Sequence, residues 1–356
     1  MRCRLVVLFA YITFAITIAH AQTESSTIQT SRGEQKTQQQ SSDDTLTAFT
    51  NRKQHNEDWT TIHLAESKLA LDATKGVVLN KVELPQGCTR ELVRLQWRPY
   101  DPIDLYVIRP RSAEKLPVVL FLYNYTYDID IFRADRWCER ATQNGFAIAG
   151  FGSALSWQRI HTPRPLKEWF VSELQEALAT STHDVQMVLN YLETRGDLDA
   201  HRVGMFGQGS GGAIAILAAA ADPRIGALDL MDPWGDWPDW LKGSKQIPEE
   251  ERAAYLQPDF LQRISNLDPV IYLPQLVGKN IRIQQVVADS VTPNPAMAKI
   301  ASAASGTAKL TRYVDIREES KALGDNGIVG WFGEQLHSSG LQNETHAELN
   351  KKGKSY

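Results

Sequence analysis

Apolar runs of strand length recur along the middle of the chain, each bounded by polar or turn-forming residues. Two of them, Leu116–Tyr123 and Phe146–Phe151, are almost continuously apolar, which is typical of strands buried on both faces of a sheet. The pattern predicts strands at Val77–Leu84, Leu92–Arg98, Ile103–Arg109, Leu116–Tyr123, Phe146–Phe151, Ile225–Met231, Arg282–Ala288 and Lys309–Ile316, with another in the apolar run that begins at Arg202.

Helical periodicity separates many of these runs. Val185, Val188, Leu189 and Leu192 fall at i, i+3, i+4 and i+7 and predict an amphipathic helix, with Ser181–Thr182 as its N-cap. Helices are also predicted at Phe132–Asn144, Asn294–Ser305 and Gly327–Leu336. Strands that alternate with helices indicate an α/β domain with a doubly wound, mostly parallel sheet. In such sheets the ligand crevice lies at the carboxyl ends of the strands.

The stretch from Arg202 to Leu217 begins as a strand, breaks at four glycines around one serine, and resumes as a helix rich in Ala, Ile and Leu. This order of strand, glycine-rich corner and helix is the geometry of a nucleophile elbow, in which a side chain is held on a strained turn above the sheet. Small residues are needed there because the two backbones pass close together. The same pattern also fits a phosphate cradle or simple close packing.

The elbow and the approach to it, from Asp184-Val185 to Arg202-Val203-Gly204, resemble the α/β-hydrolases, in particular the dienelactone hydrolase, acetyl xylan esterase and prolyl oligopeptidase branches. The resemblance implies the α/β-hydrolase fold with a short lid-like insertion. The family pattern Val-Gly-x-x-Gly-x-Ser-x-Gly-Gly places the nucleophile slot at Gly209, and Ser210 follows one residue later. Two interpretations stay open. Either Ser210 is the nucleophile of a shifted elbow made by Gly207, Gln208, Gly209, Gly211 and Gly212, or the slot is empty.

The resemblance also implies positions for an acid and a base. Asp289, after the strand Arg282–Ala288, lies at the position of the triad acid, although it could equally cap a turn; Asp232 is a second candidate. The segment directly after the last predicted strand, residues 317–326, contains no histidine, and His337 lies one helix too late. His161 could approach the crevice from another side as the base, or be a surface or packing residue. His183 is interpreted as structural.

Two aromatic stretches should lie over the crevice. In the family the loop after the Leu116–Tyr123 strand supplies the oxyanion donors, and here it is not glycine-rich but contains Tyr123, Asn124 and Tyr125, which we predict to contact substrate. Trp234 and Trp237, in the segment after the Ile225–Met231 strand, could stack on sugar rings. The alternative for the tryptophans is a lid that packs its own aromatic residues into the domain.

The ends of the chain differ in composition from its middle. Residues 1–21 resemble a signal peptide, with a basic start, an apolar run and an Ala19-His20-Ala21 cleavage site, and predict an exported protein. Residues 22–60 form a polar leader that we expect to be disordered, 61–339 the hydrolase-like domain and 340–356 a polar tail. Cleavage leaves Cys88 and Cys138, which could pair or remain separate buried thiols.

Charge and composition exclude some classes of function. A net charge of −4 over 356 residues gives no basic field for nucleic acid, and no membrane association is expected after signal cleavage. We expect no cofactor and no metal. The first hypothesis is an exported carboxylic-ester hydrolase that acts on a small-molecule ester or a carbohydrate-like ligand through Ser210. The second is a catalytically inactive protein of the same fold that binds a ligand or partner in the crevice. The sequence does not indicate the oligomeric state.

Overall fold

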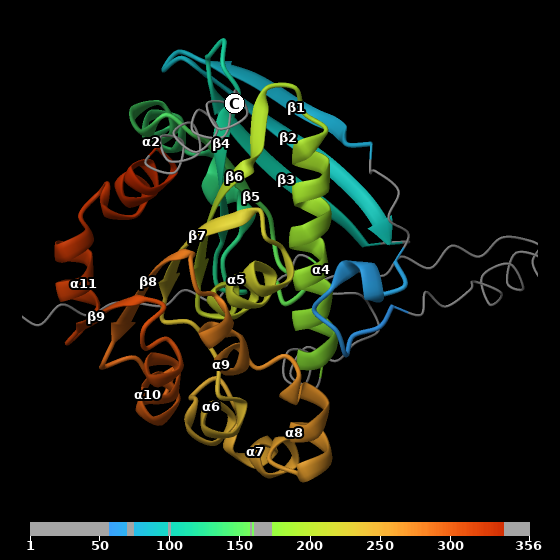
Figure 1. Cartoon of the computed structure of the whole chain (residues 1–356), viewed down its shortest axis with the longest axis vertical. Helices are drawn as coiled ribbons and strands as arrows, with labels where there is room; N and C mark the ends of the chain where they lie inside the picture. The colour runs from blue at the N-terminus through green and yellow to red at the C-terminus, as the bar shows by residue number, and fades with distance from the viewer. Residues whose placement is uncertain (1–56, 70–74, 99–100, 157–158, 160–172, 338–356) are drawn as a thin grey trace, which may run out of the picture. The chain divides into compact units, whose positions relative to one another are not determined.

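The computed structural model describes residues 57–69, 75–98, 101–156, 159 and 173–337 (Figure 1). The predicted signal peptide, most of the polar leader, His161 and the predicted tail lie outside these residues.

The described residues form one nine-stranded sheet in the order β1-β2-β3-β5-β4-β6-β7-β8-β9. Its strands are β1 (Val77–Leu84), β2 (Cys88–Arg98), β3 (Asp101–Pro110), β4 (Leu116–Leu122), β5 (Ala147–Gly150), β6 (Leu198–Gln208), β7 (Ile225–Met231), β8 (Asn280–Val286) and β9 (Lys309–Tyr313). The pairs between β1, β2, β3 and β5 are antiparallel, and all pairs from β5 through β4 to β9 are parallel. The predicted doubly wound, mostly parallel sheet is therefore confirmed.

Helices cover both faces of the sheet. They are α2 (Arg136–Asn144), α4 (Leu174–Glu193), α5 (Ser210–Ala221), α6 (Trp237–Gly243), α7 (Glu249–Tyr255), α8 (Pro258–Ser265), α9 (Pro269–Tyr272), α10 (Asn294–Ala303), α11 (Ile316–Leu323) and a last helix at 327–337. Figure 1 shows α6, α7 and α8 grouped beyond the ends of the central strands.

The two apolar layers follow from the alternation of side chains along the buried strands. In β4, Val118, Leu120 and Leu122 pack in one cluster with α4 and α5. Val119 and Phe121 face the opposite side and pack with α2 and the helix at 327–337. A strand that is apolar on both faces thus connects two separate cores, as the unbroken apolar run predicts.

The helix that contains His183 has no break at Ser181–Thr182. α4 is continuous from Leu174, and the predicted N-cap at Ser181–Thr182 is wrong. Ser181 Oγ donates to the carbonyl of Ala177, and Thr182 Oγ1 donates to that of Leu178, so both hydroxyls bond back along the helix. Serine and threonine bond in this way inside helices as well as at their starts, so composition alone misplaced the boundary.

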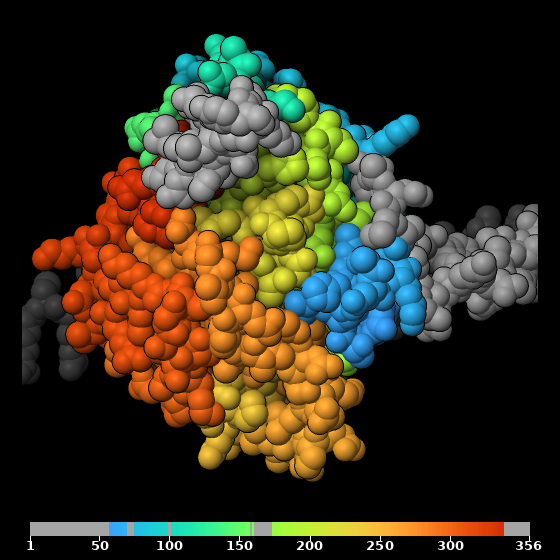
Figure 2. Space-filling view, viewed as in Figure 1, coloured from blue at the N-terminus to red at the C-terminus, as the bar shows by residue number. Residues whose placement is uncertain are grey.

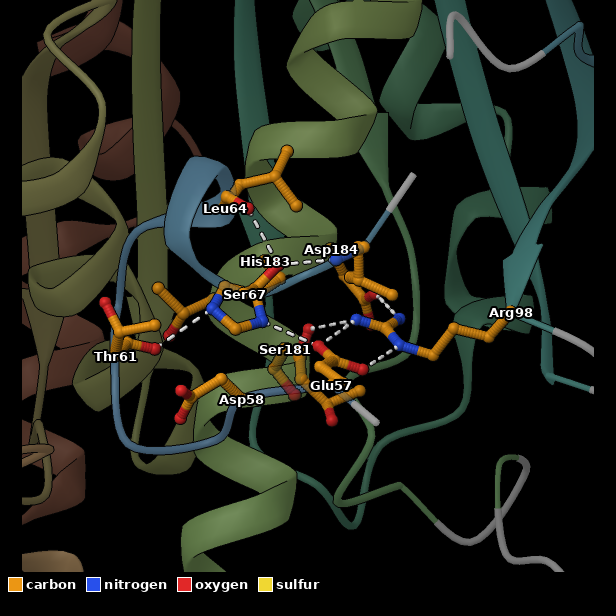
Figure 3. Close-up of polar contacts among 12 residues, drawn as sticks. Glu57, Asp58, Thr61, Leu64, Ser67, Arg98, Ser181, His183 and Asp184 are labelled. Atoms are coloured by element: carbon orange, nitrogen blue, oxygen red, sulfur yellow. Dashed lines mark hydrogen bonds and ion pairs between the residues drawn. The ribbon is translucent and has the colours of Figure 1, made fainter. Parts of the chain in front are cut away.

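A buried ion network fixes α4 to the sheet (Figure 3). The carboxylate of Asp184, fully buried, accepts hydrogen bonds from Arg98 Nη1, from Arg159 Nη1 at 2.5 Å and from Trp97 Nε1 at 3.1 Å. Arg159 also pairs with Asp101, with Nη2 2.6 Å from Oδ2. Buried charges are tolerated only when paired in this way, so each member constrains the positions of the others.

The first described segment, residues 57–69, is held against α4 by the same network. Glu57 accepts two hydrogen bonds from Arg98, at 2.5 and 2.7 Å, and its Oε1 lies 2.6 Å from His183 Nδ1. Burial raises the pKa of Glu57, but the bonds from Arg98 and His183 outweigh it and lower that pKa to about 2. Figure 2 shows the segment, in blue, on the surface beside α8, where Trp59 and Phe260 line one pocket.

Cys88, at the start of β2, and Cys138, in α2, form a disulfide within the second apolar cluster. The sequence left the pairing open. The bond links the antiparallel end of the sheet to the helix that covers it.

Candidate functional site

Gly209 forms the tip of the turn between β6 and α5. It is the single residue between the end of the strand and the first residue of the helix, with φ +55° and ψ −115°. Residues with a side chain rarely adopt this conformation, which is the strained one found at nucleophile elbows. The carbonyl of Gly209 accepts from the backbone N–H groups of Gly212, Ala213 and Trp234. The elbow is therefore formed, and the residue at its tip has no side chain.

Close packing around the tip explains the other glycines. A Cβ on Gly211 would lie 2.0 Å from the carbonyl oxygen of Leu122, and one on Gly207 would lie 2.5 Å from the carbonyl oxygen of Gly211. A Cβ on Gly212 would meet Pro233 Cβ at 2.8 Å. The contacts are with backbone or ring atoms that cannot move aside, so the crossing of strand and helix requires glycine at these positions.

Ser210 is the first residue of α5 and is fully buried. Its Oγ donates to Asn124 Oδ1 at 2.9 Å and accepts from the backbone N–H of Tyr125 at 3.0 Å. Both hydrogen-bonding functions of the hydroxyl are thus used within the protein, one residue past the tip. Gln208, on the other side of the tip, has its Nε2 3.6 Å from Met231 Sδ.

The side chain of Asn124 fills the space in front of the turn. Its Oδ1 accepts from Tyr125 N at 3.0 Å, from Ser210 Oγ at 2.9 Å and from Ser210 N at 3.4 Å. In this type of elbow, the backbone N–H after the nucleophile and one from the loop after the neighbouring strand bind the substrate oxygen. A Cβ on Gly209 would lie 3.1 Å from Asn124 Cγ and 3.3 Å from Trp234 Nε1. The tip is consequently buried rather than open to the crevice.

A small pocket adjoins Asn124 at the carboxyl ends of β4 and β5. Aromatic rings dominate its lining, and Ser153 contributes a buried hydroxyl without a hydrogen-bond partner among the described residues. The lining comprises Tyr123, Asn124, Tyr125, Tyr127, Asp128, Ile129, Ile131, Phe132, Phe151, Gly152, Ser153 and Ser156. The predicted contact residues Tyr123, Asn124 and Tyr125 thus share one pocket. Nothing in the sequence distinguished Ser153.

Both candidate acids bind neighbouring backbone. Asp289 follows β8, and its carboxylate accepts from Val291 N at 3.0 Å and Thr292 N at 2.8 Å, as in a turn cap. Asp232 follows β7 with φ +44°, and its Oδ1 accepts from Val286 N at 2.7 Å. Burial raises the pKa of Asp232 to about 7, although the bond from Val286 opposes the shift.

No histidine in the described part of the chain lies beside the turn. The loop after β9 leads through Val314 and Asp315 directly into α11. His337 Nε2 lies 3.1 Å from the carbonyl oxygen of Asn144, and His183 belongs to the ion network on α4. His161 lies outside the described residues. In the part that the structure describes, no group of three His, Cys, Asp or Glu side chains could hold a metal ion.

The tryptophans pack as a lid into the domain. Trp234 and Trp237 are each 1% exposed and belong to the core cluster shared with α4 and α5. Trp237 Nε1 donates to the carbonyl of Leu267 at 3.0 Å. Stacking of these rings on a sugar would require them to leave the core, so the predicted ligand contact by Trp237 does not agree with its position. Trp234 does reach the site, but as the packing partner of Gly209 and Tyr125.

No protein-family model matches the chain, and no curated protein matches its sequence. Solved structures do resemble it. Acetyl xylan esterase 1 from Thermoanaerobacterium sp. JW/SL YS485 is 14% identical, with a TM-score of 0.59 over 75% of this chain and 90% of that one. Acetyl xylan esterase from Paenibacillus sp. R4 is 15% identical, with a TM-score of 0.55 over 70% of this chain and 86% of that one.

S-formylglutathione hydrolase from Agrobacterium tumefaciens is also 15% identical, with a TM-score of 0.55 over 73% of this chain and 99% of that one. At such low identity a structural likeness shows the fold and not the activity. The strand order, the elbow between β6 and α5 and these similarities together show that the chain has the α/β-hydrolase fold.

Proposed function

We propose that this protein is a catalytically inactive α/β-hydrolase-fold protein whose crevice binds a ligand instead of hydrolysing an ester. The observation that carries the proposal is Gly209 at the tip of the elbow, with φ +55° and ψ −115°. Acyl transfer in this fold requires a nucleophilic side chain at that residue. Glycine supplies none.

The surroundings of Ser210 support the same conclusion. An attacking serine needs a base that accepts its proton, whereas Ser210 Oγ donates to the carboxamide oxygen of Asn124. An amide oxygen is a hydrogen-bond acceptor but a very weak base. Asn124 also occupies the donors that would stabilise an oxyanion, so a substrate carbonyl would have to displace it.

Carboxyl groups, and no histidine, are present in the described segment after β9. Glu319, in α11 after β9, is 1% exposed, and its Oε1 has no hydrogen-bond partner among the described residues. Burial, with smaller effects from Asp229 and Asp289, raises the pKa of Glu319 to about 7. An acid–histidine pair requires an ionised acid beside an imidazole, and this region instead contains Glu319 and Asp232, both with raised pKa values.

The structural neighbours suggest which ligand classes to test first. Two of them are acetyl xylan esterases by name, so carbohydrate esters and small acyl compounds are the first ligands to test. Binding without turnover is the expected outcome for this chain.

We also infer that the protein is exported. The signal-peptide pattern of residues 1–21 motivates this inference, and the Cys88–Cys138 disulfide supports it, because such bonds persist in oxidising compartments. No helix among the described residues is long and apolar enough to cross a membrane.

Ester hydrolysis tests the inactive assignment. Purified wild-type protein should hydrolyse 4-nitrophenyl acetate at the buffer rate, and Ser210→Ala should not change that rate. Gly209→Ser should gain less than about tenfold, because no base is present to activate the new hydroxyl. It should also lose about 1–3 kcal/mol of unfolding free energy through backbone strain.

The matched control for that loss is Gly226→Ser, at an exposed position where a Cβ would meet only the carbonyl oxygen of Val203, at 4.0 Å. It should leave stability nearly unchanged. Wild-type turnover that disappears in Ser210→Ala would contradict the assignment and restore Ser210 as the nucleophile.

Stability should depend on pH through Glu319. Its pKa is raised on folding, so between about pH 4.5 and 7 the folded state holds a proton that the unfolded state has lost, and the free energy of unfolding falls as pH rises. Glu319→Gln should reduce this fall and be more stable than the wild type at pH 8, by about 2–3 kcal/mol. Exposed Glu114→Gln is the control. Urea unfolding at each pH measures the effect, and an unchanged slope in Glu319→Gln would refute it.

Export predicts a defined amino terminus. Sequencing of the protein recovered outside the cytoplasm should begin at Gln22, because cleavage follows Ala21. Recovery of the chain with Met1 still attached in a membrane fraction would contradict this inference.

A further inference from the structure

Three hydrogen-bond donors converge on a single oxygen in front of the elbow. They are Tyr125 N, Ser210 N and Ser210 Oγ, at 3.0, 3.4 and 2.9 Å from Asn124 Oδ1. Two of the donors belong to the first residue of α5, a helix of 12 residues whose amino end favours partial negative charge. An amide oxygen has two lone pairs, so three donors exceed its usual number, and the Tyr125 N–H is shared with Ser210 Oγ at 3.0 Å.

We propose that these donors form a recognition site for the oxygen of a neutral carboxamide, which Asn124 occupies as an internal plug that an external carboxamide can replace. This inference rests on the proposed function. When the tip lacks a nucleophile, these donors can still bind the oxygen of a ligand non-covalently. It adds the chemical class of the ligand and the group that competes with it.

The charges around the pocket favour a neutral ligand over an anion. None of the described residues that line the pocket is Lys, Arg or His, and Asp128 contributes a carboxyl group. A carboxylate bound there would lose its hydration without gaining a counter-ion, which is costly. A carboxamide offers the same oxygen without the charge, and its nitrogen donates hydrogen bonds.

Ser153 is a second polar group in the lining of the pocket beside Asn124. Ser153 Oγ is buried, with the residue 2% exposed, and has no hydrogen-bond partner among the described residues. A buried hydroxyl without a partner destabilises the fold, so its retention is consistent with a partner that comes and goes, such as a ligand or a water.

The plug sits on a segment that could move without disturbing the core. Asn124 is the second residue after the end of β4, and its carbonyl accepts from Tyr127 N in a short turn. Thr126 and Tyr127 are exposed, and Tyr127 is 46% exposed. Withdrawal of the Asn124 side chain therefore breaks contacts at the elbow but no strand pairing.

Cavity complementation tests the proposal. The atoms removed by Asn124→Gly correspond to acetamide, so acetamide should bind this variant with a dissociation constant at least tenfold lower than that for the wild type. Titration followed by the backbone amide NMR signals of Tyr125 and Ser210 reports the site directly. Addition of Ser210→Ala to the variant should weaken acetamide binding roughly two- to tenfold, the effect of one lost hydrogen bond.

The controls separate the proposal from its alternatives. Acetate at the same concentration should not shift the two signals, because none of the described residues that line the pocket is Lys, Arg or His. Asn144→Gly, which removes a carboxamide remote from the elbow, should gain no acetamide binding that perturbs Tyr125 or Ser210. If Asn124→Gly does not fold, Asn124→Ala with formamide provides the equivalent pair.

The proposal would be overturned if acetamide did not shift the Tyr125 and Ser210 signals of a folded variant. It would also be overturned if acetate bound that variant as tightly as acetamide. Ester hydrolysis by the wild type would instead refute only the inactive assignment, because it is measured in a separate assay and leaves the titration unchanged.

Discussion

The close crossing of β6 and α5 is the constraint on which the site depends. At Gly211 a Cβ would lie 2.0 Å from the backbone of Leu122, so the helix lies directly against the end of β4. This contact forces the chain to reverse in one residue, and the reversal requires the positive φ of Gly209. The fold therefore specifies the shape of the elbow independently of what stands at its tip. With glycine there, the geometry is preserved and no side chain stands at the tip.

Glycine at the tip has consequences for the residues around it. Without the Asn124 side chain, Ser210 N would lose its acceptor, whereas Tyr125 N would keep Ser210 Oγ, and buried donors without partners are destabilising. Asn124 Oδ1 accepts from both N–H groups, and Trp234 closes the space above Gly209. The packing that accompanies glycine thus fills the space that a side chain at the tip would face. Stability and activity are separate properties of this fold, which is why likeness to esterases does not establish esterase activity.

Much of the fold could be predicted from local patterns. A predicted strand overlaps each of the nine strands of the described sheet, although β2 and β6 each begin four residues before the predicted start. Buried central strands such as β4 leave a direct trace in the sequence as unbroken apolar runs. The short helices α7, α8 and α9 between β7 and β8 left no such trace. They contain only seven, eight and four residues, too few for a helical period, and proline accompanies each start.

The candidate site was predictable only in part. The glycine spacing placed Gly209 in the nucleophile slot, but the competing choice of Ser210 depended on φ and ψ at the turn, which residue types alone do not specify. The contact between Asn124 and Ser210 joins residues 86 positions apart and depends on the orientation of one carboxamide. The pairing of Glu57 with His183 spans 126 positions, and the polar composition around Glu57 favoured a disordered leader. Tertiary contacts of this kind have no local signature.

The reactivity of Ser210 tests the central claim most directly, because fluorophosphonates modify serines that act as nucleophiles in this fold. Folded wild-type protein treated with such a probe should show no adduct on the peptide that contains Ser210 by mass spectrometry, with an active serine esterase labelled in the same tube as the control. Stoichiometric modification of Ser210 that is lost on unfolding would contradict the account.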